Sequence, residues 1–148
     1  MKCIAHRGYS LKYRDNSIEA IREAIHREYD GVEIDVQLCE TGELVLFHDV
    51  YIKGKFISEM RLDQLKELGI ITLQDVYEEI SDIRRTLLIL DIKGADLGVV
   101  KALEKFYEKE STENVTFCSF NRKIIYSLPS EFKIGSTFET TFHKSEYP

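Results

Sequence analysis

The sequence predicts an α/β fold: an incomplete (β/α) barrel of about five parallel strands with one inserted antiparallel hairpin. Short apolar runs alternate with amphipathic helical patterns, and this alternation alone fits an open α/β sheet as well as a barrel. The charged residues favour the barrel, because the central strands of an open sheet are apolar on both faces. Glu33, Asp35, Asp91 and Lys93 stand near the C-terminal ends of otherwise apolar strands, and barrel active sites lie at that end.

The composition predicts one folded domain over residues 1–148, because 43% of the residues are hydrophobic and 31% are charged. The net charge of −6 argues against a nucleic-acid-binding protein with a general basic surface. No apolar run approaches the ~20 residues that a membrane span needs, and the N-terminus does not resemble a signal peptide. Cys3, Cys39 and Cys118 each lie in an apolar run without C-x-x-C spacing, so we expect buried free thiols and a cytoplasmic location.

The first expected unit is a strand, a helix and a second strand. A strand over residues 3–5 ends at His6 and Arg7, and a helix capped by Asn16 or Ser17 follows it. The apolar face of this helix consists of four residues, Ile18, Ile21, Ile25 and Tyr29. Because a βαβ unit joins parallel strands, the strand after the helix should pair in parallel with the first.

That second strand begins a hairpin. Residues 32–38 alternate between apolar and polar side chains, and a second apolar run over 44–47 ends at His48. The connection is too short for a parallel crossover, so the two runs should pair antiparallel. A turn centred on residues 41–42 would place Asp35 opposite His48 and gather the polar side chains on one face. An ordinary amphipathic hairpin with a solvated face is the alternative interpretation.

The later segments continue the alternation of helices and strands. They are expected in this order: a loop over 51–60, a short helix over 62–68, a helix capped by Thr72, a strand over 87–90, a helix over 99–107, a strand over 115–120, a helix capped by Asn121, a strand over 133–138 and a polar tail over 140–148.

The polar groups at the strand ends suit phosphate chemistry. Three carboxylates, from Glu33, Asp35 and Asp91, form a set of hard oxygen ligands for Mg²⁺ or Ca²⁺. The side chains of Arg7 and Lys93 suit a phosphate oxyanion, although Asp91 and Lys93 could also form an ordinary ion pair.

Two histidines complete this set. His6 and His48 can act as a general base and a general acid, and together with a bound cation they would allow metal-assisted cleavage of a phosphate ester. A strand-end histidine bonded to backbone is the alternative for each of them. Asp49 is expected at most to orient loop backbone, His26 to be a solvated helix residue, and His143 has no assigned role.

Five motifs point to one family: H-R-G at 6–8, D-N-S at 15–17, G-V-E-I-D-V-Q-L at 31–38, T-G-E-L-V-L-F-H-D at 41–49 and D-I-K at 91–93. Together, over residues 3 to about 138, they resemble the glycerophosphodiester phosphodiesterase family. The resemblance implies a TIM-type barrel that uses a divalent metal to hydrolyse glycerophosphodiesters to glycerol phosphate and an alcohol.

The resemblance also assigns roles to individual residues. His6 and His48 match the catalytic histidine pair of the family, and Arg7 and Lys93 match positions that contact phosphate. The metal ligands of the family correspond to three acidic residues, Glu33, Asp35 and Asp91. A small-molecule glycerophosphodiester or a lysophospholipid is therefore the expected substrate.

Two substitutions depart from the family pattern. Asp15 replaces the glutamate of the usual E-N-T motif, and Asp91 replaces that of the usual E-I-K motif. An aspartate in D-I-K is found in the related sphingomyelinase D and phospholipase D toxins, which release a cyclic phosphate by transfer to an internal hydroxyl. A lysophospholipase D-like or sphingomyelinase D-like transfer is therefore the alternative activity, and a non-catalytic phosphate-binding remnant is a further one.

The length also departs from the pattern. A closed barrel takes roughly 250 residues, whereas this chain has 148 and about five strands, so roughly three βα units are absent. An open edge exposes unpaired backbone, so we expect a homodimer in which a second copy covers it. A tail that folds across the gap is the alternative, and loss of activity in a degenerate barrel is also compatible with the sequence.

Overall fold

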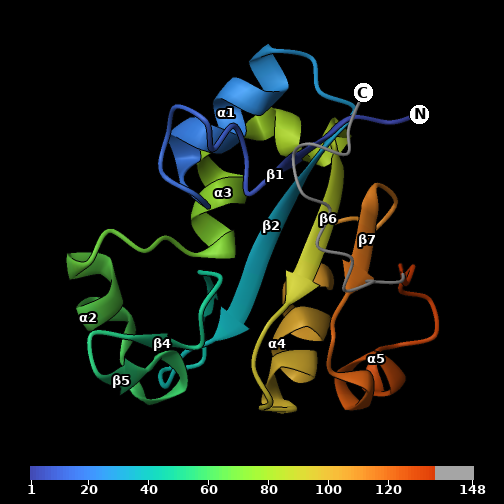
Figure 1. Cartoon of the computed structure of the whole chain (residues 1–148). Helices are drawn as coiled ribbons and strands as arrows, with labels where there is room; N and C mark the ends of the chain where they lie inside the picture. The colour runs from blue at the N-terminus through green and yellow to red at the C-terminus, as the bar shows by residue number, and fades with distance from the viewer. Residues whose placement is uncertain (136–148) are drawn as a thin grey trace.

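The computed structural model describes residues 1–135 of the chain. Its main sheet contains four parallel strands, β1 (Ile4–His6), β2 (Gly31–Leu38), β6 (Leu87–Ile92) and β7 (Val115–Cys118), in the order β1-β2-β6-β7. A fifth strand, β3 (Leu44–Leu46), pairs antiparallel with the end of β2. The strands lie side by side in Figure 1, with the arrowheads of β2, β6 and β7 pointing the same way. Within residues 1–135 the sheet does not close into a barrel.

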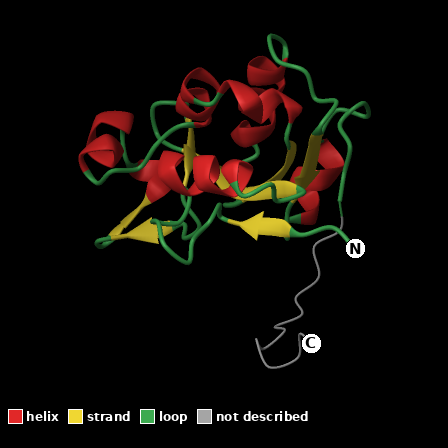
Figure 2. Cartoon of the chain, turned by 90° about the horizontal axis from the view of Figure 1, so that it is seen from above, coloured by secondary structure: helices red, strands yellow, loops and turns green. Residues whose placement is uncertain are grey.

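Helices alternate with the parallel strands, as the sequence predicts. They are α1 (Ile18–His26), α2 (Leu62–Glu67), α3 (Leu73–Glu79), α4 (Gly98–Tyr107) and α5 (Arg122–Ser127), with 3₁₀ turns η1 (Ile57–Glu59) and η2 (Ser81–Arg85). Most helices lie on one side of the strands in Figure 2. The opposite face of the sheet is therefore free to carry polar side chains.

The helix starts follow capping rules. Ser17 caps α1, because its Oγ accepts a hydrogen bond from the Ala20 N–H. Thr72 and Asp75 form the reciprocal pair of a capping box at α3, and the Asn121 side chain caps α5. The predicted caps at Thr72 and Asn121 are confirmed, and Ser17 is the cap where the sequence allowed two residues.

The two faces of β2 explain both the core and the site. Val32, Ile34 and Val36 have no exposed surface and pack in the apolar cluster that includes residues of α1, α3 and α4. The alternate residues Glu33 and Asp35 consequently point to the other face. Ile34 and Val36 therefore face the helices, as predicted, and Glu33 and Asp35 lie on the face that would be the interior of a closed barrel.

The hairpin forms, but its predicted register was wrong by one residue. Val36 lies opposite Leu46, so His48 follows the end of β3 and is not paired with Asp35. The turn spans residues 39–42, because the Gly42 N–H donates to the Cys39 carbonyl, and Gly42 then takes the left-handed conformation with φ 91°. This is a three-residue loop with a glycine bulge, which accommodates one residue more than the two-residue turn that was expected.

The segment 51–60 is not the loop that was predicted. β4 (Tyr51–Ile52) and β5 (Lys55–Phe56) form a short hairpin, which lies with α2 near the end of β2 in Figure 1. Lys53 and Gly54 connect them with φ values of 47° and 82°, the left-handed pair of a type I′ turn. A lysine there gives little sequence signal for this turn.

Cys3 is exposed, so only Cys39 and Cys118 are the buried free thiols that were predicted. The last predicted strand is represented by a parallel bridge between Ile134 and Phe117, and residues 136–138 lie outside the described part. The predicted polar tail, including His143, also lies outside it.

Candidate active site

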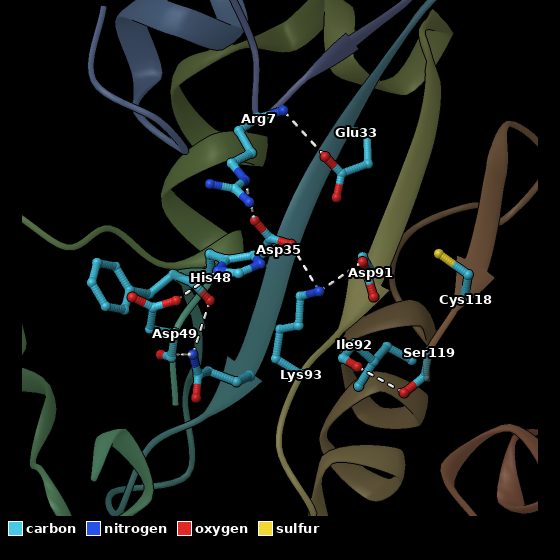
Figure 3. A network of polar contacts seen from close by, with 12 residues as sticks. Arg7, Glu33, Asp35, His48, Asp49, Asp91, Ile92, Lys93, Cys118 and Ser119 are labelled. Atoms are coloured by element: carbon cyan, nitrogen blue, oxygen red, sulfur yellow. Dashed lines mark hydrogen bonds and ion pairs between the residues drawn. The ribbon is translucent and has the colours of Figure 1, made fainter. Parts of the chain in front are cut away.

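The strand register brings the polar residues of distant segments together. His6 on β1 is the register partner of Glu33 on β2, and Asp35 on β2 is that of Asp91 on β6. Parallel strands end at one edge of the sheet, so these side chains gather near the strand ends (Figure 3). Three strands of largely apolar sequence, β1, β2 and β6, thus bring together polar groups that are up to 85 residues apart in the chain.

Three carboxylates form the centre of the site. One oxygen from each of Glu33, Asp35 and Asp91 lies within 4.8 Å of the others. Asp35 is 1% exposed, and its Oδ1, like Oδ1 of Asp91, is buried and accepts no hydrogen bond. A buried carboxylate oxygen that accepts no hydrogen bond is costly, so these two oxygens fit a site that binds a cation.

Crowding of negative charge affects Glu33 most. Its burial, and then the negative charge of Asp35, raise the pKa of Glu33 to about 8. The backbone N–H of Arg7 donates to Glu33 Oε2 at 3.1 Å and partly offsets this effect. A divalent cation held between the carboxylates would favour the ionised form of Glu33 further.

Lys93 bridges two of the carboxylates. Its Nζ donates to Asp91 Oδ2 at 2.8 Å and lies 3.5 Å from Asp35 Oδ1 (Figure 3). Its backbone N–H donates to the Val36 carbonyl. This bond continues the β2–β6 ladder and positions the backbone from which the Lys93 side chain extends. Burial lowers the pKa of Lys93, but the bond to Asp91 and the negative charges of Asp91, Asp35 and Glu33 together outweigh burial and leave the pKa above its ordinary value. The ammonium therefore stays charged within the site.

Arg7 links β1 to the carboxylates. Its Nη1 donates to Asp15 Oδ2 at 2.9 Å, and its Nε lies 3.3 Å from Asp35 Oδ2. The residue takes a left-handed conformation with φ 59°, and Gly8 follows with φ 79°. A Cβ at Gly8 would lie 2.6 Å from the backbone carbon of Ala20, so the chain turns tightly against α1 here.

The two histidines line the same cavity. This cavity has a volume of about 300 Å³ and is lined by six of the predicted site residues and one aromatic ring, namely His6, Glu33, Asp35, His48, Asp91, Lys93 and Phe120. Arg7 lines a neighbouring cavity of about 170 Å³ together with His48. The structure therefore brings together all seven residues that the sequence singled out.

The ring nitrogens of the histidines have different partners. His6 Nε2 lies 3.6 Å from Glu33 Oε2, and burial followed by the charge of Arg7 lowers the pKa of His6. His48 Nδ1 lies 2.6 Å from Asp49 Oδ1 (Figure 3). Asp49 therefore holds the His48 ring, which the sequence analysis did not foresee when it gave Asp49 at most a backbone role.

Sequence reasoning also missed two supporting amides. Gln37 Nε2 donates to the carbonyls of Phe47 and Asp49 at 2.8 Å each, and so fastens the loop that carries His48. Asn16, which the sequence analysis considered as a helix cap and as part of the D-N-S motif, bonds twice to Asp35. The inward position of Gln37 in the strand alternation was a usable signal for the first, whereas no sequence pattern ties Asn16 to a residue 19 positions away.

Comparison with known proteins places this site in a family. The family model of the glycerophosphoryl diester phosphodiesterase family matches residues 6–127. The chain belongs to this family. The matched range includes all seven predicted site residues, and the resemblance that the motifs indicated is thereby confirmed.

Individual relatives support this family assignment. A curated glycerophosphodiester phosphodiesterase of Caldanaerobacter subterraneus is 28% identical over 161 residues, covering 92% of this chain and 66% of that protein. The crystal structure of a glycerophosphodiester phosphodiesterase from Thermotoga maritima is 31% identical with a TM-score of 0.79, covering 92% of this chain and 62% of that one. A phosphodiesterase of Oleispira antarctica, solved with the product sn-glycerol-3-phosphate, is 26% identical with a TM-score of 0.80, covering 92% and 65%.

The chain spans slightly less than two thirds of each of these relatives. The family fold is a TIM-type barrel, and the described residues supply four of its parallel strands, so the predicted fold class is confirmed. None of the helices within residues 1–135 has the length and apolar character required to cross a membrane.

Proposed function

We propose that this chain carries the active site of a divalent-cation-dependent phosphodiesterase that hydrolyses glycerophosphodiesters to glycerol phosphate and an alcohol. The observation that carries this proposal is the convergence of three carboxylates, two histidines and a lysine on one cavity. The names of the relatives support the substrate class, as does the glycerol phosphate bound to the Oleispira antarctica protein.

The residues fit a divalent cation. All three candidate ligands, Glu33, Asp35 and Asp91, offer carboxylate oxygens, and two of the oxygens are buried without a hydrogen bond. Hard oxygen sets of this kind suit Mg²⁺ or Ca²⁺. When bound, such a cation would supply charge stabilisation at the phosphoryl oxygens.

The other side chains supply binding and proton transfer. Arg7 and Lys93 carry positive charge beside the carboxylates and would orient the phosphate. Of the histidine pair, one ring takes a proton from the attacking water as the water oxygen bonds to phosphorus, and the other gives a proton to the leaving alkoxide as its P–O bond breaks. Because Asp49 occupies His48 Nδ1, Nε2 is the nitrogen of His48 that remains for this transfer.

The test is an assay of the purified chain on glycerophosphocholine and glycerophosphoethanolamine with Mg²⁺, Ca²⁺ or Mn²⁺. Glycerol phosphate should be released, and His6→Ala and His48→Ala should each abolish most of the release. His26→Ala is the matched control, because His26 is an exposed histidine on α1 and should be silent. Absence of release with every cation would contradict the proposal.

Asp91, in place of the longer glutamate of the family pattern, supports a lysophospholipase D-like transfer as the alternative reaction. Lys93 Nζ is bonded to Asp91 Oδ2 at 2.8 Å, so this aspartate is held within reach of the other carboxylates despite its missing methylene. The D-I-K motif is shared with enzymes that transfer phosphate to an internal hydroxyl. A cyclic phosphate as the end product from a lysophospholipid would favour such a lysophospholipase D-like reaction, and cation binding without turnover would favour a non-catalytic remnant.

We also propose a homodimer that covers the open edge of the sheet. Beyond β7, the described residues provide a single bridge, between Phe117 and Ile134. Phe120 and Ile134, near this edge, are 55% and 47% exposed. An unpaired edge with apolar neighbours is a template for association. Sedimentation at twice the 17.2 kDa of one chain is expected, and a stable monomer would contradict the dimer.

The predicted cytoplasmic location remains a proposal. The three cysteines, Cys3, Cys39 and Cys118, are free thiols, which is compatible with a reducing compartment.

A further inference from the structure

Asn16 uses both atoms of its side-chain amide on a single residue, Asp35. Its Nδ2 donates to Asp35 Oδ2 at 3.0 Å, and its Oδ1 accepts the backbone N–H of Asp35 at 3.1 Å. The two residues are 5% and 1% exposed, so water does not compete for these bonds. The pair of bonds fixes the Asp35 carboxylate relative to its own backbone, in one orientation.

The two oxygens of Asp35 consequently differ. Oδ2 accepts a hydrogen bond from Asn16 Nδ2 and lies 3.3 Å from Arg7 Nε. Oδ1 is buried, accepts no hydrogen bond and lies 3.5 Å from Lys93 Nζ, on the side of Asp91. One oxygen is thus occupied by the protein and the other faces the carboxylate cluster (Figure 3).

We propose that Asn16 is a positioning residue for the cation site, which holds Asp35 Oδ1 toward the cation by occupying Asp35 Oδ2. The inference rests on the cation of the proposed function and adds a residue that lines the neighbouring cavity with Arg7 and His48. Partners of this kind orient ligating carboxylates and commonly change metal affinity by 10- to 100-fold.

A backbone explanation of Asn16 competes with this one. The residue takes a left-handed conformation with φ 57°, and its N–H donates to the Arg7 carbonyl just before the α1 cap. Asparagine is among the few non-glycine residues that adopt this conformation readily. Glycine satisfies the backbone requirement equally well but lacks the amide, so Asn16→Gly separates the two explanations.

The experiment is a calorimetric titration of Mn²⁺ into the wild-type chain, Asn16→Gly and Ser17→Ala. Ser17→Ala is the matched control, because it removes the adjacent cap bond to the Ala20 N–H without touching Asp35. We expect the dissociation constant for Mn²⁺ to rise about 10- to 100-fold in Asn16→Gly and to stay at the wild-type value in Ser17→Ala. Asn16→Ala, which keeps a Cβ, should lose affinity in the same way and decides the question if the glycine variant is unfolded by circular dichroism.

Two results overturn the inference alone. The first is an Asn16→Gly variant that binds Mn²⁺ with the same dissociation constant as wild type, which would show that Asn16 serves only the backbone conformation. The other is an equal loss in Ser17→Ala, which would reduce the effect to general loosening at the start of α1. A wild-type chain that binds no Mn²⁺ would overturn the cation of the proposed function and this inference with it.

Discussion

Asp91 lies directly beside Asp35 in the register of β2 and β6, and Lys93 Nζ contacts the carboxylates of both. Neither Oδ1 accepts a hydrogen bond, although both are buried. A pair of neighbouring strands thus holds two carboxylates at close range, and Lys93 and the Arg7 guanidinium, whose Nε lies 3.3 Å from Asp35 Oδ2, offset them only in part. This clustering of carboxylates lowers the stability of the cation-free protein and favours binding of a cation. A substitution in the cluster can therefore raise stability while it weakens function.

Glu33→Gln should therefore stabilise the cation-free protein while weakening its response to cations. Because the pKa of Glu33 is raised to about 8, folding at neutral pH costs free energy to protonate this buried carboxylate or to keep it charged, and glutamine removes that cost while its oxygen can still accept the Arg7 N–H. Thermal unfolding in EDTA should give a higher midpoint for Glu33→Gln than for wild type. Added Mg²⁺ or Mn²⁺ should raise the midpoint of wild type clearly more than that of the variant. A lower midpoint in EDTA would contradict the account of charge crowding.

Asp49 should act through His48. Its carboxylate lies 2.6 Å from His48 Nδ1, so Asp49→Ala should lower turnover by less than His48→Ala, which removes a proton-transfer group worth about 100- to 10,000-fold. The double variant should be no slower than His48→Ala, because the two residues act as a unit. Asp63→Ala, at another exposed aspartate, is the control. Additive losses in steady-state kinetics would show that Asp49 acts independently of His48.

Gly8→Ala should destabilise the fold more than Gly42→Ala. Both glycines have positive φ, which costs roughly 1–2 kcal/mol for alanine. A Cβ at Gly8 would also meet Ala20 at 2.6–2.8 Å, whereas a Cβ at Gly42 meets nothing within 4 Å. Overpacking adds about 1–3 kcal/mol. Urea unfolding measures the difference, and equal losses would contradict the tight packing of the turn after Arg7 against α1.

The buried Tyr77–Tyr107 pair should make stability fall at high pH. The hydroxyls lie 2.9 Å apart, and burial raises the pKa of Tyr77 to about 12 and that of Tyr107 above its ordinary value. Because the folded state holds these protons more tightly, the stabilisation is complete below about pH 10 and is lost as the pH rises toward 12. Thermal midpoints of wild type should fall more steeply over this range than those of the double variant Tyr77→Phe/Tyr107→Phe.

The control for this pH series is Tyr126→Phe, because Tyr126 is 81% exposed. Its midpoints should follow wild type at every pH. Parallel curves for wild type and the double phenylalanine variant would contradict the assignment of the steep decline to the buried pair.

The residues of the site were predictable from sequence because strand periodicity fixes which side chains leave the core. Glu33 and Asp35 interrupt an apolar strand, and an interruption with period 2 defines one face. Their roles as cation ligands, and those of His6 and His48 in proton transfer, remain predictions that the assays above test.

The errors arose where one residue changes the backbone path. Gly42 adds a bulge that shifted the hairpin register by one residue, and Lys53 adopts a left-handed conformation that its residue type does not signal. Asn16 and Asp49 were missed for another reason. Each acts through a contact with a neighbouring functional side chain, and side-chain contacts follow from three-dimensional placement that periodicity does not specify.

The most direct test of the central claim is phosphorus NMR of glycerophosphocholine incubated with the purified chain and Mg²⁺. The account predicts that the diester resonance is replaced by that of glycerol phosphate, that EDTA stops the conversion, and that His48→Ala and Asp91→Ala do not convert the substrate. A diester resonance that persists with every divalent cation, or a conversion that is indifferent to EDTA and to both substitutions, would contradict it.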